Sequence, residues 1–163
     1  MIVRALFCLA AVAACSPNSS NQKTAQASDS AFAKLQQRGA GVMGVDQYTS
    51  QHVFEPLPNG GRIVLQRKES DSAGEAVIRE HMRTIAKSFA AGDFTLPGVV
   101  HAMKDVPGTV QMRALRKDIT YTPQDLPRGG EVLIATSNPQ AVQAIHEFLA
   151  FQRSDHRAGM HME

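Results

Sequence analysis

The chain has 163 residues, with 17 Lys and Arg against 15 Asp and Glu, so its formal net charge is +2. A balance this close to neutral gives no electrostatic basis for binding nucleic acid. The length fits one globular domain behind an N-terminal segment, because a chain this short rarely forms two separate hydrophobic cores.

The N-terminus has the pattern of a bacterial export signal. Arg4 precedes an apolar run over residues 5–14, and Val12-Ala13-Ala14-Cys15 closes it. This ending resembles the lipobox of bacterial lipoprotein precursors, in which diacylglycerol is attached to the Cys and the chain is cleaved before it. We therefore expect residues 1–14 to be removed as a signal peptide and Cys15 to carry the lipid. The alternative is an ordinary secretory signal in which Cys15 is incidental.

The same resemblance implies a location in the cell envelope. It predicts a chain anchored to the membrane through its lipid, and Ser16 in place of Asp after the Cys favours the outer membrane, facing the periplasm. Loss of Arg4 leaves 17 minus 1, or 16, basic residues against 15 acidic ones. Because Cys8 lies in the discarded segment, the mature chain would have no disulfide and no free thiol.

Residues 15–40 are predicted to connect the lipid to the domain. The stretch 16–30 has no aromatic or branched aliphatic side chain, which predicts a disordered tether. Ser30 is a candidate N-cap for a short helix over 31–38, which Gly39 would end. The remaining residues, 41–163, are expected to form a single domain.

One unit occurs twice within that domain. Residues 57–61 (LPNGG) match residues 126–130 (LPRGG), and each copy leads into a β-branched and aliphatic run. We interpret each copy as a turn between two strands, with Asn59-Gly60 and Gly129-Gly130 at the turn positions. Strands are accordingly expected before each turn, over 51–55 and 119–122.

A helix is predicted after each hairpin. The first has Ser72 and Glu75 as a capping box and ends at Gly92. The second has Asn138 as its N-cap and Pro139 in its first turn. Apolar residues recur at helical spacing in both: Ile78, Met82, Ile85 and Phe89 in the first, and Ile145, Phe148 and Leu149 with Gln152 in the second. The chain is therefore predicted to be α+β, with two ββα repeats forming an antiparallel sheet and the helices packed on one face.

The helices match less well than the hairpins. Aligning His81 with His146 pairs Ala76-Val77 with Ala141-Val142, but it puts the apolar stripes of the two helices out of phase. The hairpins are thus the firmer part of the repeat.

Histidine and methionine are the residues that could bind a ligand. They occur together at His81-Met82, at His101 with Met103, and from His156 to Met162 at the C-terminus. Imidazole and thioether suit copper, with the soft sulfur favouring Cu(I). Our hypothesis is that His101 and Met103, with His81 or His146 across the repeat interface, hold a copper ion or a haem. The alternative is that these side chains are structural.

The segment that contains His101 is apolar for a linker. Residues 94–108 include Leu96, Val99, Val100 and Val106, so we expect the segment to pack across the domain and form one wall of any cleft.

No catalytic motif is present. The chain has no Gly-x-Ser-x-Gly elbow, Walker loop, Gly-x-Gly-x-x-Gly or His-Glu-x-x-His. The sequence therefore assigns no catalytic residue. An enzyme with a dispersed active site would need Asp46, Tyr48 or Tyr121 to meet a histidine in the cleft.

Residues 44–50, 57–63 and 144–153 resemble a family of small bacterial lipoprotein-type proteins without an established activity, and the similarity extends over Gly44 to Gly159. Some members are labelled aspartate carbamoyltransferase. That activity needs a Ser-Thr-Arg-Thr phosphate loop at a helix start, whereas Arg83-Thr84 lies inside a predicted helix here. The sequence therefore favours a membrane-anchored, non-enzymatic binding or interaction domain. An exposed apolar patch would favour a protein partner in the envelope, and convergent imidazoles would favour a bound ligand.

Overall fold

The computed structural model describes residues 19–159 except 45 and 47. The predicted signal peptide, Cys15 and the C-terminal Met160, His161 and Met162 lie outside the described residues.

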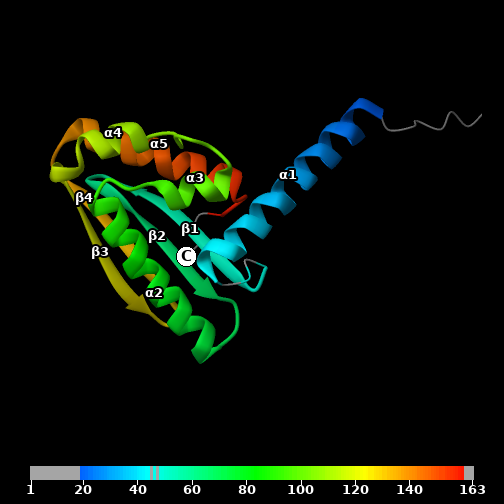
Figure 1. Ribbon diagram of the computed structural model, residues 1–163, viewed down its shortest axis with the longest axis horizontal. Helices are drawn as coiled ribbons and strands as arrows, with labels where there is room; N and C mark the ends of the chain where they lie inside the picture. The colour runs from blue at the N-terminus through cyan, green and yellow to red at the C-terminus, as the bar shows by residue number, and fades with distance from the viewer. Residues whose placement is uncertain (1–18, 45, 47, 160–163) are drawn as a thin grey trace, which may run out of the picture.

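Four antiparallel strands form the sheet, in the order β1-β2-β4-β3 (Figure 1). The strands are β1 (Ser50–Leu57), β2 (Gly60–Arg67), β3 (Ile119–Leu126) and β4 (Gly129–Thr136). Each predicted hairpin forms one half of the sheet, and the halves meet along β2 and β4. The predicted α+β fold with two ββ hairpins is confirmed.

The first turn lies one residue earlier than predicted, and the second lies two residues earlier. Pairing of Leu57 with Gly60 and of Leu126 with Gly129 leaves Pro58-Asn59 and Pro127-Arg128 as the turn residues. The glycines instead begin β2 and β4, where those strands approach each other closely. A Cβ on Gly129 would lie 2.1 Å from the Leu65 carbonyl oxygen, so the position has no room for a side chain.

Helices α2 (Ser72–Ala90) and α5 (Pro139–Asp155) cover one face of the sheet. Helix α2 packs on β3 and β4, whereas α5 packs on β1 and β2, so each helix covers the hairpin of the other repeat. Both predicted apolar stripes are buried. The shorter helices α3 (Thr95–His101) and α4 (Thr109–Ala114) and the 3-10 turn η1 (Arg116–Asp118) connect the two repeats.

The cap of α2 differs from the predicted one by one residue. Asp71 has an extended φ of −153°, and its carboxylate accepts a hydrogen bond from the Gly74 amide at 3.2 Å. Asp71 therefore replaces Ser72 as the N-cap, and Glu75 accepts from the Asp71 amide at 3.3 Å. Asn138 caps α5 as predicted.

Helix α1 (Ser19–Met43) corrects the predicted tether. The described part of the stretch 16–30 is helical, and the helix neither begins at Ala31 nor ends at Gly39. Its C-terminal half buries a stripe at helical spacing, which includes Leu35, Gly39 and Met43 and packs against α3. That packing stabilises the helix, and Ala, Gln and Lys are good helix formers that extend it towards the N-terminus.

The sheet has an internal pseudo-twofold axis. Ile63 pairs with Val132 at its centre, and the pair Gly60–Ala135 on one side is matched by Gln66–Gly129 on the other. The two halves of the sheet are therefore equivalent positions of one repeated unit.

The helices α2 and α5 are related by the same pseudo-twofold axis. Their register differs from the one that the sequence alignment of His81 with His146 gave. His146 Nε2 donates to the carbonyls of Leu57 (2.9 Å) and Gly60 (3.0 Å). The Arg79 guanidinium donates to the equivalent carbonyls, those of Leu126 (3.0 Å) and Gly129 (3.1 Å).

Arg79, and not His81, is thus the counterpart of His146. In this register the N-caps Asp71 and Asn138 coincide, and Met82 corresponds to Leu149. The apolar stripes then fall in phase, which resolves the conflict in the sequence alignment.

Candidate functional site

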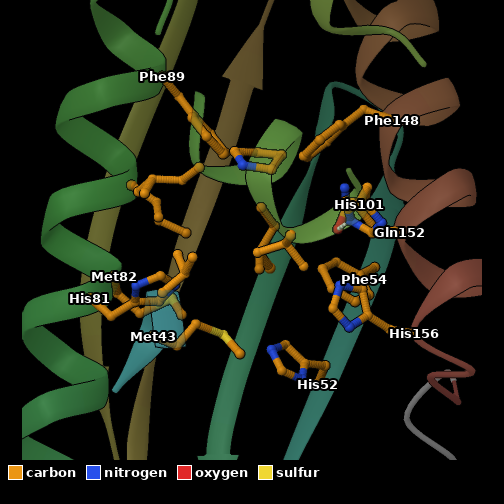
Figure 2. Close-up of a pocket in the computed structure, with 16 residues that line it drawn as sticks. Met43, His52, Phe54, His81, Met82, Phe89, His101, Phe148, Gln152 and His156 are labelled. Carbon is orange, nitrogen blue, oxygen red and sulfur yellow. Dashed lines mark hydrogen bonds between the residues drawn. The ribbon is translucent and has the colours of Figure 1, made fainter. Parts of the chain in front are cut away.

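A cavity of ≈ 60 Å³ lies between α1, α2, α3, α5 and the sheet (Figure 2). Most of its lining is apolar, including Phe54, Phe89 and Phe148. Its other lining residues that carry side-chain nitrogen or sulfur are His52, His81, His101, His156, Gln152, Met43 and Met82. We call this space the histidine cavity.

The imidazoles reach the cavity from four separate elements. His52 belongs to β1, His81 to α2 and His101 to α3, while His156 is the C-cap of α5. The ring centroids of His52 and His156 are 5.1 Å apart, and those of His101 and His156 are also 5.1 Å apart. The predicted role of segment 94–108 as a cavity wall is confirmed, because Leu96, Val100 and His101 line it.

His101 is held in place from two sides. Its Nδ1 lies 2.5 Å from a carboxylate oxygen of Asp155, and its Nε2 lies 2.9 Å from the amide oxygen of Gln152. Both ring nitrogens are therefore engaged by side chains of α5. The His101 side chain is 1% exposed.

The pKa values of three imidazoles of the cavity are lowered, which favours their neutral form at pH 7. Burial lowers the pKa of His52 to about 4, with a further contribution from the nearby His81. Burial likewise lowers the pKa of His81 to about 4. The pKa of His156 falls to about 3, first through burial and then through His52 and His101, against the opposing effect of Asp155. Neutral imidazoles have a nitrogen lone pair that is free to accept a proton or a metal ion.

Two polar atoms of the cavity wall have no partner. The Nδ1 of His156 and the Nε2 of Gln152 are buried without a hydrogen bond in the described part of the chain, and Gln152 as a whole is 5% exposed. Buried polar atoms in folded proteins are nearly always paired. The two atoms therefore indicate that a ligand or water molecules complete this wall.

The four metal ligands proposed from the sequence do not converge. His81 and His101 line the cavity, but Met103 is 40% exposed and lines a separate surface hollow. His146 is committed to the Leu57 and Gly60 carbonyls of the β1–β2 turn and does not line the cavity. Within residues 19–44, 46 and 48–159, no group of three or more His, Cys, Asp or Glu side chains is placed to hold a metal ion.

His52 is the cavity residue that the sequence analysis missed. His52 and Phe54 are two residues apart in β1, so both side chains point to the covered face of the sheet. That spacing was visible in the sequence. The position of Met43 had no comparable signal, because it depends on how α1 docks.

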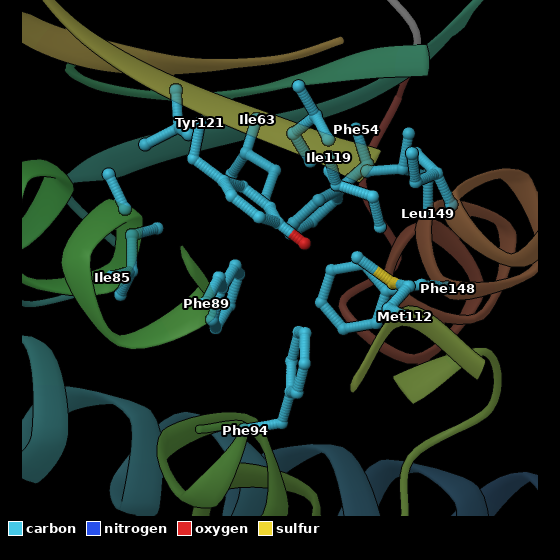
Figure 3. Packing of buried hydrophobic residues seen from close by; sticks show 14 of the residues in the cluster. Phe54, Ile63, Ile85, Phe89, Phe94, Met112, Ile119, Tyr121, Phe148 and Leu149 are labelled. Atoms are coloured by element: carbon cyan, nitrogen blue, oxygen red, sulfur yellow. The ribbon is translucent and has the colours of Figure 1, made fainter. Parts of the chain in front are cut away.

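Of the residues proposed for a dispersed enzyme site, Tyr48 lies beside histidines, but outside the histidine cavity. Tyr121 lies in the aromatic core beside Phe89, with burial raising its pKa (Figure 3). The carboxylate of Asp46 accepts from the backbone amide of Tyr48 at 2.8 Å. Tyr48 is 61% exposed, on a separate surface hollow whose wall also includes His52 and His156.

The two halves of the pseudo-symmetric fold differ in polarity. By the register of the axis, His52 corresponds to Tyr121 and His156 corresponds to Phe89. The pair Tyr121–Phe89 packs edge to face with centroids 5.8 Å apart, whereas its counterpart is the stacked pair His52–His156. The fold therefore accommodates aromatic carbocycles at positions where the cavity has imidazoles.

Further hollows lie on the described surface, one of which is lined by the exposed Val99 and Met103. The large exposed hydrophobic side chains are spread over the loop before β1, over α2 to α4 and over the loop after α3: Tyr48, Val77, Val99, Met103 and Val110. None of the described helices combines the length and the apolar character that crossing a membrane requires.

Comparison with known proteins adds no further assignment: no family model, curated protein or solved structure matches the chain.

Proposed function

We propose that the chain is a non-enzymatic binding domain of the bacterial cell envelope, anchored to the membrane through Cys15, and that its ligand occupies the histidine cavity. The anchoring rests on the lipobox pattern of residues 12–15. The binding function rests on the contrast between the two halves of the fold.

That contrast supports the proposal because it distinguishes residues that stabilise the fold from residues that are retained for binding a ligand. Tyr121 and Phe89 fill one half mainly with aromatic carbon, and buried apolar surface stabilises a core, although the Tyr121 hydroxyl is itself buried without a partner among the described residues. His52 and His156 at the equivalent positions desolvate polar rings, one of them with an unpaired nitrogen. Such groups cost stability. Residues that lower stability where the fold accepts better alternatives are typical of functional sites.

Exchanging the side chains at equivalent positions of the two halves tests this proposal without knowledge of the ligand. The variant His52→Tyr/His156→Phe is expected to keep the free energy of unfolding at pH 7 or raise it by about 1–3 kcal/mol, because aromatic carbon replaces two desolvated imidazoles and the unpaired Nδ1 of His156 is removed. The matched exchange Tyr121→His/Phe89→His is expected to lower it by more than about 2 kcal/mol, because it buries polar rings in the core. Urea denaturation measures both.

A loss of stability in His52→Tyr/His156→Phe comparable to that of its matched control would mean that the histidines are structural. His156→Phe alone is the second variant, since it removes the unpaired Nδ1 without enlarging residue 52.

The anchor has its own test. Mass spectrometry of the chain isolated from bacterial membranes is expected to find an N-terminus at Cys15 that carries a diacylglycerol and an additional acyl chain. Cys15→Ser is expected to release the protein from the membrane fraction, since one or more acyl chains supply its membrane affinity. An unmodified Cys15 thiol or an intact Met1 would contradict the proposal.

Two of the alternatives receive no support from the geometry. A cavity of ≈ 60 Å³ is well below the ~300–1,000 Å³ typical of pockets for larger ligands, so it has no room for a haem. The scattered exposed apolar residues do not favour a protein partner over a ligand.

A further inference from the structure

Two buried thioethers lie on the same cavity as the imidazoles. Met43 is 8% exposed and Met82 is 2% exposed, and both line the histidine cavity. In Figure 2 the sulfur of Met43 lies between His52 on one side and the pair His81 and Met82 on the other. Two imidazoles and two thioethers from α1, β1 and α2 therefore face one space.

The rings of His52 and His81 are not committed elsewhere. Among the described residues no hydrogen bond engages a ring nitrogen of either, in contrast to His101, both of whose nitrogens are paired, and to His146, whose Nε2 is paired. His52 makes ring contacts only, with Phe54 and His156. Both rings thus have nitrogen lone pairs that can serve a ligand.

The positions of these side chains are not dictated by packing. Met82 corresponds to Leu149 across the pseudo-twofold axis, and His81 corresponds to Phe148. The equivalent positions of the other repeat are apolar and lack nitrogen or sulfur. Methionine and histidine are therefore specific to the half that lines this part of the cavity.

We propose that His52, His81, Met43 and Met82 bind Cu(I). This inference rests on the proposed function and names its ligand. Thioether sulfur and imidazole nitrogen are the donors that favour Cu(I), and none of the four is a carboxylate that a hard cation would require. A monovalent ion also suits an apolar cavity better than a divalent one, because the desolvation cost of an ion rises steeply with its charge.

The structure also provides a way in. His52 and His156 line both the histidine cavity and the surface hollow beside Tyr48, so their stacked rings form the partition between the two. The hollow is therefore the route by which we expect an ion to reach the cavity. The unpaired Nδ1 of His156 lies on this path.

Anaerobic competition between the protein and a Cu(I) chelator tests the proposal. The full chain with Cys8→Ser and Cys15→Ser is used, so that no thiol competes for the ion. We expect one Cu(I) per chain, with sulfur and nitrogen neighbours in X-ray absorption. Met43→Leu/Met82→Leu, which nearly conserves volume, is expected to weaken binding at least tenfold, as is His52→Tyr alone.

Matched controls use thioethers and an imidazole that the proposal does not assign to the copper site. Met103→Leu is expected to leave the affinity unchanged, and so is Met160→Leu/Met162→Leu together with His161→Gln. Affinity that survives Met43→Leu/Met82→Leu, affinity lost in the C-terminal variant, or the absence of bound Cu(I) would each overturn the proposal.

Failure of the Cu(I) proposal can be distinguished from failure of the proposed binding function. If Cu(I) does not bind but His52→Tyr/His156→Phe remains as stable as the unaltered chain, the cavity serves another ligand. If that exchange unfolds the domain, the imidazoles are structural and both proposals fail.

Discussion

Gly129→Ala is expected to lower the free energy of unfolding by more than about 4 kcal/mol, which is outside the usual range for a single substitution. The added Cβ would lie 2.1 Å from the carbonyl oxygen of Leu65 and 2.9 Å from the Cα of Gln66. Both atoms belong to the backbone of β2, so no side-chain rotation relieves the overlap. The central strands must separate, and with them the pairing that joins the two halves of the sheet.

Gly60 is the position equivalent to Gly129 across the pseudo-twofold axis. Gly60→Ala is expected to be as damaging, because its Cβ would lie 2.0 Å from the carbonyl oxygen of Ile134 and its φ is +146°. Gly41→Ala is the control: no atom lies within 4 Å of that position, which is in α1. It is expected to raise stability by up to about 1 kcal/mol, because alanine favours a helix over glycine.

Urea denaturation of the three variants measures these effects. A Gly129→Ala protein that unfolds within about 1 kcal/mol of the unaltered chain would mean that β2 and β4 are not paired as described.

Acidification is expected to destabilise the domain between pH 6.5 and about 4. The pKa values of His52 and His81 are about 4 and that of His156 is about 3, against 6.5 for a free ring. In this pH range these three histidines are protonated in the unfolded chain but not in the folded chain. The free energy of unfolding therefore falls as the pH falls. Each of the three groups contributes up to about 1.4 kcal/mol per pH unit, and none contributes above pH 6.5.

The direction of the effect follows from burial, because a charged ring in the apolar cavity loses hydration. Asp155 opposes it at His156 alone. His52→Tyr/His156→Phe removes two of the three groups and is expected to flatten the pH dependence by more than half. Urea denaturation of both proteins at steps between pH 7 and pH 4 measures this. Parallel curves would show that other groups cause the acid sensitivity.

Local patterns in the sequence determined the elements of this fold. The helical stripes of α2 and α5, the Asn138 cap and the two hairpins are present in the structure as predicted. Each depends on the period of a short segment or on one residue beside a helix end, so the sequence alone was sufficient. Errors of one residue occurred where two adjacent choices were chemically similar, as with Asp71 and Ser72.

The residues of the candidate site could not be predicted from local sequence patterns in the same way. His81 and His101 were proposed together and do line one cavity, but Met103 and His146 do not join them. What replaces them, Met43 and His52, comes from a helix and a strand that the sequence did not connect with the others. Even the true counterpart of His146 was hidden, because Arg79 shares its role at the turn but not its chemistry.

The sequence by itself thus determined which segments become helices and strands and which face of each is apolar, because these properties depend on neighbours a few residues apart. Only the tertiary structure decided which side chains meet. Helix α2 covers the hairpin of the second repeat and α5 that of the first, and α1 closes the remaining side. Packing over long sequence separations, which no local period encodes, therefore assembles the imidazoles and thioethers of the cavity.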